Sequence, residues 1–304
     1  MYDMVYFEIS GLCNARCPWC VRGNGHLKSY PARFIPPQEF QKGIERLFDE
    51  GLIGPDSIVG LYNYGEPLLH PSLKDILKIL SDNKLKFIFS TNASVFVDLD
   101  ENLFKNLQNF FISIPGFSQK SYDKIHGFTF EEILKNIDKW IDLIGPDRIQ
   151  IQYHVYKFNL DEINAAATYF KQKGLRFFPY CALMADYELA LSYLNNTLPK
   201  DLSEKASREL LLSYVKDYIT LLPKKYTCLQ ESILTIDEYC NVLTCCLISK
   251  ADPDYSIGSL FSLSREEIES KKICQNICRE CRENGIAYWV HNVYRPEFIQ
   301  KYDQ

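Results

Sequence analysis

Short runs of strand-forming residues alternate with helix-forming segments through the first 180 residues, and this alternation restricts the fold more than any other feature. The predicted strands cover residues 4–10, 57–62, 86–90, 110–114, 148–156 and 176–180. The predicted helices cover residues 36–50, 72–83, 101–108, 118–126, 129–143 and 161–173. Strands that alternate with helices form parallel sheets with right-handed crossovers. The sequence therefore predicts an α/β fold of about six βα units.

A cluster of three cysteines directly follows the first predicted strand. Cys13, Cys17 and Cys20 are separated by three and then two residues. In parallel α/β folds, the loops at the carboxyl ends of the strands build the functional site. Three thiolates leave one corner of a cubane 4Fe–4S cluster without a protein ligand, whereas a cluster that only stores electrons takes four cysteines. The spacing therefore indicates a cluster whose open iron binds a substrate or a cofactor.

Two plainer interpretations of these cysteines compete with this one. Zinc knuckles also use closely spaced cysteines, but they usually complete four ligands within a short stretch. No fourth cysteine follows in this loop, and His26 is the nearest other candidate. Chance clustering is the second alternative, because the chain has 11 cysteines among 304 residues.

A second motif separates these interpretations. The cysteine spacing, with Trp19 just before the third cysteine, resembles the signature of the radical S-adenosylmethionine (SAM) superfamily. After the second predicted strand, Gly65-Glu66-Pro67 resembles that family's Gly-Gly-Glu-Pro turn, with Tyr64 in place of the first glycine. The resemblance implies a partial (β/α)6 barrel in which SAM chelates the fourth iron of the cluster. It also implies that Trp19 lies beside the adenine and that the Glu66 carboxylate receives the amino group of SAM.

Two further positions fit the same resemblance. Asn92 follows the third strand, where many relatives have a Thr-Asn-Gly turn, although an ordinary Asx turn explains this residue equally well. Ser113 lies at the end of the fourth strand, where a serine commonly contacts the methionyl or ribose part of SAM. Pro115 replaces the acidic residue usual there, so only Ser113 is carried over as a cofactor-binding residue.

A second set of cysteines lies between residues 228 and 281. It resembles the SPASM/twitch extension, in which a cysteine pair flanking a β-hairpin and a late C-x2-C hold an auxiliary 4Fe–4S cluster. The resemblance implies these ligands: Cys228, Cys245, Cys278 and Cys281. Cys246 is an alternative to Cys245, and Cys274 could complete the set. The hairpin is predicted at residues 232–236 and 241–244. A four-cysteine zinc site is the competing interpretation of these cysteines.

The cysteine-rich part is predicted to form its own domain. We expect the barrel core at residues 1–200 and a linker helix with the auxiliary-cluster domain at residues 201–304, the helix covering residues 202–222. Most other cysteines should be small buried hydrophobes. Cys181, at the end of the sixth strand, and Cys240, beside the hairpin, are candidate hydrogen-atom donors to a substrate radical.

Composition excludes several classes of function. The net charge is −5 and no run of Lys and Arg occurs, so we expect no nucleic-acid partner. No secretory signal is evident, and no apolar run approaches the roughly 20 residues that span a bilayer. We therefore expect a cytoplasmic protein without membrane contact, in which clustered cysteines more often bind metal than form disulfides.

The resemblance implies an enzyme that reductively cleaves SAM to a 5′-deoxyadenosyl radical, which removes a hydrogen atom from a substrate. A flavodoxin or ferredoxin would be the reductant. The expected reaction is oxidation, dehydrogenation or epimerisation of a sugar-like or other small polar substrate, because no peptide-recognition domain precedes the first strand. Modification of a ribosomally made peptide or a protein is the alternative. A non-enzymatic zinc or iron–sulfur scaffold that binds a partner is the second alternative.

Overall fold

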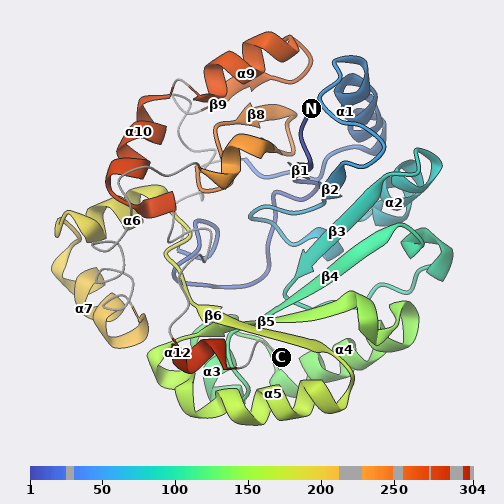
Figure 1. Ribbon diagram of the computed structural model, residues 1–304. Coiled ribbons are helices and arrows are strands. Elements are labelled where there is room, and N and C mark those ends of the chain that lie inside the picture. Colours follow the sequence, from blue (N-terminus) through green and yellow to red (C-terminus); the bar gives the residue numbers. More distant parts are fainter. Residues whose placement is uncertain (25–30, 212–227, 249–255, 274, 288–296, 302–304) are drawn as a thin grey trace.

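One nine-stranded sheet organises the chain (Figure 1). The structure, a computed structural model, describes residues 1–24, 31–211, 228–248, 256–273, 275–287 and 297–301. The strand order is β6-β5-β4-β3-β2-β1-β7-β8-β9. The first six strands are β1 (Met4–Phe7), β2 (Ile58–Gly60), β3 (Lys86–Thr91), β4 (Leu107–Ile114), β5 (Ile149–Val155) and β6 (Arg176–Cys181). Each of them pairs in parallel with its sequence neighbour, as the βα alternation predicts.

Helices connect these strands and lie along the outside of the sheet (Figure 1). The helices of the barrel part are α1 (Pro37–Asp49), α2 (Leu73–Asp82), α3 (Gln119–Lys124), α4 (Phe130–Ile144) and α5 (Ile163–Gln172). They are followed by α6 (Tyr187–Leu194) and α7 (Lys200–Glu209). Short 3-10 turns cover Pro67–Leu69, Glu101–Phe104, Pro146–Arg148, Lys157–Glu162 and Leu229–Ser232.

The two faces of each strand have different surroundings. On β5, Ile149, Ile151 and Tyr153 are fully buried, whereas the alternating residues Gln152 and His154 are only half-buried. Successive side chains of a strand point to opposite faces, so a strand of this pattern separates an apolar face from a polar one. The apolar face packs against the helices, and the polar face is turned inward.

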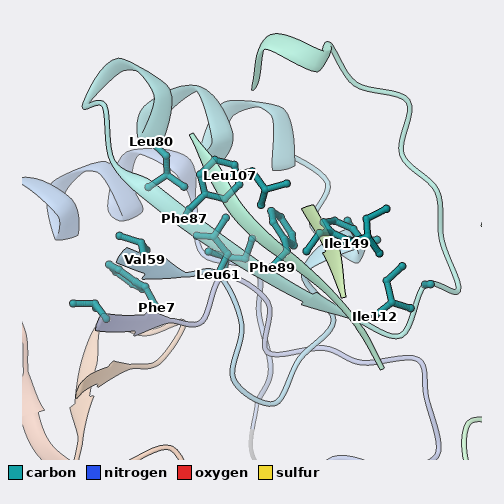
Figure 2. Close-up of a cluster of buried hydrophobic side chains, with 14 of the residues drawn as sticks. Phe7, Val59, Leu61, Leu80, Phe87, Phe89, Leu107, Ile112 and Ile149 are labelled. Atoms are coloured by element: carbon teal, nitrogen blue, oxygen red, sulfur yellow. The ribbon is translucent and has the colours of Figure 1, made fainter. Parts of the chain in front are cut away.

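The hydrophobic core therefore fills the layer between the sheet and its helices. Figure 2 shows Phe7, Val59, Phe87 and Phe89 on neighbouring strands, with Leu80 of α2 above them. Rings also contact one another closely across this layer, for example those of Phe7 and Phe40 with centroids 4.9 Å apart. Burial of such large side chains supplies the main stabilising term of the fold.

The C-terminal part extends the same sheet. Strand β7 (Ile233–Ile236) pairs in parallel with β1, from Met4 opposite Ile233 to Phe7 opposite Ile236. Strands β8 (Asn241–Leu243) and β9 (Ser256–Ser259) then add antiparallel. The helices of this part are α9 (Arg265–Ile273), α10 (Asn276–Glu283) and α12 (Glu297–Gln300). The predicted hairpin is thus present and is continuous with the barrel sheet.

Two predicted helices differ from the structure. The helix expected at 101–108 is a short 3-10 turn that ends at Phe104, and β4 already begins at Leu107. The helix expected at 202–222 includes α7, but Leu210 is extended, with φ −99° and ψ 152°. Residues 212–222 lie outside the described part of the chain. The division into two domains at residue 200 stays a prediction. Strand β7, which lies beyond this boundary, continues the sheet of the first part.

A buried asparagine fixes the carboxyl ends of two central strands. The Asn159 side chain donates to the carbonyls of Pro115 and His154 at 2.8 and 2.9 Å, and it accepts from the Tyr156 amide at 2.8 Å. Asn159 is fully buried. The residues that follow β4 and β5 are therefore held in one relative position.

Replacing Asn159 by Ala should lower the free energy of unfolding by about 3 kcal/mol, because buried backbone groups lose their partners. Urea denaturation followed by circular dichroism measures this loss. Asn83→Ala is the matched control, since the Asn83 amide is exposed and bonds only to Ile79 O of its own helix. Equal effects of the two substitutions would contradict this role of Asn159.

Candidate functional site

A cleft of about 330 Å³ opens at the carboxyl ends of the parallel strands. The loops after β1, β2 and β3 form one wall of the cleft, and inward-facing residues of β4, β5 and β6 form the other. The lining residues predicted from the sequence are Cys13, Cys17, Trp19, Cys20, Gly65, Glu66, Asn92 and Ser113. Residues far apart in the chain are thus brought to one site.

The loop after β1 carries three thiols into this cleft. Cys13, Cys17 and Cys20 all line it, and none of them is in a disulfide. A tight turn orders the loop, with the Cys20 amide donating to the Cys17 carbonyl at 3.2 Å. The amide of Ala185 donates to the Trp19 carbonyl at 2.8 Å, which ties the loop to the segment after β6.

A close backbone contact joins this loop to the loop after β2. A Cβ atom at Gly65 would lie 1.7 Å from the carbonyl oxygen of Ser10 and 3.0 Å from that of Leu12. The fully buried Glu8 carboxylate accepts hydrogen bonds from the amides of Tyr64 and Gly65 at 2.8 and 2.6 Å. Glycine is required at position 65 because no side chain fits between the two loops. Glu8 was not predicted from the sequence, where it is one polar residue within a strand.

The Glu66 carboxylate lies in the cleft wall and is only 2 % exposed. It accepts hydrogen bonds from Thr91 Oγ1 at 2.7 Å, from the Asn92 amide at 2.8 Å and from the Leu68 amide at 3.1 Å. Burial raises the pKa of Glu66 to about 7, and these three hydrogen bonds oppose the increase. The carboxylate therefore fixes the ends of β2 and β3 relative to each other and changes charge near neutral pH.

Asn92 and Trp19 link the thiols to their surroundings. The side-chain Nδ2 of Asn92 lies 3.9 Å from Cys13 Sγ and donates to Asn14 Oδ1 at 3.1 Å. The Trp19 indole is 2 % exposed, and its Nε1 donates to Glu209 Oε2 of α7 at 3.0 Å. Helix α7 therefore packs against the indole and fixes its position.

Three of the predicted residues do not line the cleft. Pro67 is buried as the first residue of a 3-10 turn. Cys181 alternates along β6 with Tyr180, which does line the cleft, so Cys181 is on the opposite, core-facing side of the sheet. Cys240 is fully buried in the same core, in the turn between β7 and β8. Neither cysteine lines the cleft, and the role of Cys181 or Cys240 as a hydrogen-atom donor stays a prediction.

Part of the cleft wall is polar but uncharged. Tyr180 Oη and His154 Nε2 are 2.6 Å apart, and His126 Nδ1 is buried without a hydrogen-bond partner among the described residues. Burial lowers the pKa of His154 to about 4 and that of His126 to about 3, so both rings are neutral at pH 7. Neither Lys nor Arg is among the described residues that line the cleft. Sequence reasoning missed these residues, because single histidines and tyrosines carry no motif.

The chemistry of the three thiols fits a metal cluster. Burial raises the pKa of Cys13 to about 12 and also raises the pKa values of Cys17 and Cys20. Buried thiols ionise at neutral pH only beside a positive charge, which iron supplies. The buried Tyr64 hydroxyl has no hydrogen-bond partner among the described residues, and Tyr64 packs against Cys20. The residues present therefore match a group that binds thiolates and accepts hydrogen bonds.

The predicted auxiliary ligands meet at a second, smaller site. Cys228, Cys245, Cys278 and Cys281 line one largely apolar pocket of about 50 Å³. Cys278 and Cys281 are on α10, three residues apart, and therefore lie on one face of that helix. Burial raises the pKa of Cys245 to about 11 and raises that of Cys228 as well.

The two alternative ligands have different outcomes. Cys246 does not line this pocket. The geometry thus favours Cys245 over Cys246 as the ligand. Cys274 lies outside the described residues.

Two features are absent from the described ranges of the chain. No three His, Cys, Asp or Glu side chains in this part of the chain converge where one metal ion would bind them all. None of the described helices combines the length and apolar character that crossing a bilayer requires.

Comparison with known sequences identifies a matching family. The model of the Radical SAM superfamily matches residues 7–170. The curated AdoMet-dependent heme synthase of Methanosarcina barkeri is 26% identical over 175 residues, which make up 56% of this chain and 48% of that protein. The chain thus spans about half the length of this relative.

Solved structures share the fold. Streptococcus suis SuiB bound to precursor peptide SuiA aligns with a TM-score of 0.60 at 13% identity, covering 88% of this chain and 64% of SuiB. A histidine-tagged form of anSMEcpe with bound AdoMet aligns with a TM-score of 0.58 at 13% identity, covering 91% of this chain and 78% of that chain. At this identity the likeness establishes the architecture, and the predicted α/β partial barrel is confirmed.

Gly65→Ala should lower the free energy of unfolding by about 3 kcal/mol, because its Cβ would overlap the backbone of Ser10. Chemical denaturation of the purified variant measures this change. Gly54→Ala is the matched control, since its Cβ would meet only the flexible end of the exposed Met1 side chain. A Gly65→Ala protein as stable as this control would disprove the close contact.

Proposed function

The chain belongs to the radical SAM superfamily, and from this premise we propose that its cleft holds a 4Fe–4S cluster and SAM and acts on a substrate bound beside them. Cys13, Cys17 and Cys20 are the proposed cluster ligands. The chemistry supplied by the cluster and SAM, once bound, is one-electron cleavage of SAM to a 5′-deoxyadenosyl radical that removes a hydrogen atom from the substrate.

The convergence of three thiols and one buried carboxylate on a single cleft carries this proposal. Three thiolates leave one iron of a cubane cluster open. The Glu66 carboxylate is near enough to raise the pKa of Cys13. A ligand whose amino group would bind the open iron therefore has an anionic hydrogen-bond acceptor within reach.

The other residues of the cleft have positioning roles in this proposal. Trp19 forms the wall beside the adenine, and its hydrogen bond to Glu209 fixes the indole. Asn92 orders the residues around Cys13. Ser113, on the inward face of β4, contacts the ribose or methionyl part of SAM.

The uncharged wall supports a neutral polar substrate. His126, His154 and Tyr180 offer hydrogen bonds without a positive charge to attract a phosphate or carboxylate group. We therefore propose oxidation, dehydrogenation or epimerisation of a sugar-like or other small polar molecule. Peptide amides are equally neutral, and the fold is shared with SuiB, which binds a precursor peptide. Modification of a peptide is accordingly the second candidate.

We also propose an auxiliary 4Fe–4S cluster at Cys228, Cys245, Cys278 and Cys281, in a C-terminal domain of residues 201–304. The sulfur atoms of a tetrahedral zinc site are roughly 4 Å apart, because Zn–S bonds are about 2.3 Å long. No such convergence occurs among the described cysteines. A cubane cluster binds each thiolate at a separate iron, so its ligands are spaced more widely. This favours a cluster over the zinc alternative.

Anaerobic reconstitution with iron and sulfide tests the proposal. We expect about eight irons per chain and formation of 5′-deoxyadenosine after addition of dithionite and SAM. Cys13→Ala should abolish 5′-deoxyadenosine formation and retain about four irons, because the second site is untouched. Chromatography of the nucleoside and iron analysis provide the two readouts.

Cys246→Ala is the matched cysteine control and should retain both clusters, since Cys246 lines neither pocket. Absence of 5′-deoxyadenosine from the wild-type protein, with about four irons or fewer, would instead favour a metal-binding scaffold without catalytic activity.

SAM affinity should increase with pH between 6 and 8. Below its pKa of about 7 the Glu66 carboxyl is protonated and neutral, and above it the carboxylate is the stronger hydrogen-bond acceptor for the amino group of SAM. This contribution changes affinity by at most about tenfold per pH unit. Equilibrium dialysis of SAM at several pH values measures it, and Glu66→Gln should show a flatter profile. An identical profile for wild type and Glu66→Gln would argue against this role.

A further inference from the structure

A buried ammonium group lies at the second cysteine site. Lys272, in the last turn of α9, lines the same pocket as the four proposed ligands and is only 5 % exposed. Lysine is rarely buried unless it has a partner. The sequence offers no hint of this position, because Lys272 follows another lysine in an ordinary charged helix.

The contacts of Lys272 connect the chain segments that carry the cysteines. Its Nζ donates to the carbonyl oxygen of Gln230, two residues after Cys228. A weaker contact of 3.5 Å joins Nζ to the carbonyl of Thr244, the residue before Cys245. The backbone carbonyl of Lys272 in turn lies 3.9 Å from Cys278 Sγ. The Lys272 side chain thus contacts the segment that carries Cys228 and the segment that carries Cys245.

No carboxylate among the described residues forms an ion pair with Lys272. The other cation of this pocket, Arg282, pairs with Glu231 at 3.4 Å. The thiols of Cys228, Cys245 and Cys278 line the same pocket as Lys272 and lie within electrostatic range of it. A buried cation without a counter-charge is costly, so thiolates are its available partners.

We propose that Lys272 is the counter-cation of the auxiliary metal centre. Its ammonium group offsets the negative charge of a centre with four thiolates and raises the reduction potential of a 4Fe–4S cluster bound there. This inference rests on the proposed auxiliary cluster. Reduction adds one electron to an already anionic centre, and a cation in a medium of low dielectric constant stabilises the reduced form more than the oxidised form.

The test compares reduction potentials in the full-length Cys13→Ala protein, in which only the second cluster should remain. Dithionite supplies the electron in a titration monitored by electron paramagnetic resonance. Lys272→Gln removes the charge and keeps a hydrogen-bond donor, whereas Lys272→Arg keeps the charge. We expect Lys272→Gln to lower the ratio of reduced to oxidised cluster at a fixed potential about tenfold, which corresponds to about 59 mV for one electron.

Lys271→Met is the matched control, because Lys271 is the exposed neighbour on the same helix. Lys272→Arg and Lys271→Met should both retain the potential of the parent protein. An unchanged potential in Lys272→Gln would overturn the proposal.

If Lys272→Gln fails to assemble the cluster, the charge-conserving variant Lys272→Arg shows whether the loss of charge is the cause. Assembly in Lys272→Arg but not in Lys272→Gln supports a need for positive charge. Failure of both variants to assemble, beside an intact parent, overturns the proposal, since the shape of lysine and not its charge would then be required. A Cys13→Ala parent that binds zinc alone, or no iron, refutes the proposed cluster itself and is recognised before any Lys272 variant is measured.

Discussion

The close approach of the loops after β1 and β2 is the contact on which the site depends. The backbone of Gly65 lies against that of Ser10 and Leu12, and Glu8 binds the amides beside it. This contact sets the position of the Glu66 carboxylate relative to the cysteine loop. Because the obstacle to any side chain at position 65 is backbone and not a movable side chain, the geometry has little freedom to adjust.

The pairing of β1 with β7 relates the two cysteine sites to each other. Strand β1 leads directly into the cysteine loop, and β7 follows the segment that carries Cys228. Both sites are therefore attached to one hydrogen-bonded sheet. Tyr64 lies within electrostatic range of Cys20 in the first site and of Cys245 in the second. The two sites are consequently neighbours within a single framework.

The predictions that succeeded came from local patterns. The strands of the barrel, the hairpin and the α/β partial barrel are observed, and membership of the predicted superfamily is confirmed. The error at 101–108 arose because a 3-10 turn and the first residues of β4 together mimic helical spacing. Cys181 ends β6 as expected, but a period of two does not say which face of a strand is inward, and only the structure shows that Cys181 faces the core and Tyr180 the cleft.

By itself the sequence determined the order of the elements and the kinds of ligand, because spacing between neighbouring residues depends on local geometry. Cys13, Cys17 and Cys20 had to share one loop, whereas the helix that puts Cys278 and Cys281 on one face is known only from the structure. Only the tertiary structure decided that Cys245 and not Cys246 faces the second pocket, and that Lys272 lies among its thiols. Such choices depend on contacts between residues far apart in the chain, which packing selects and no local pattern encodes.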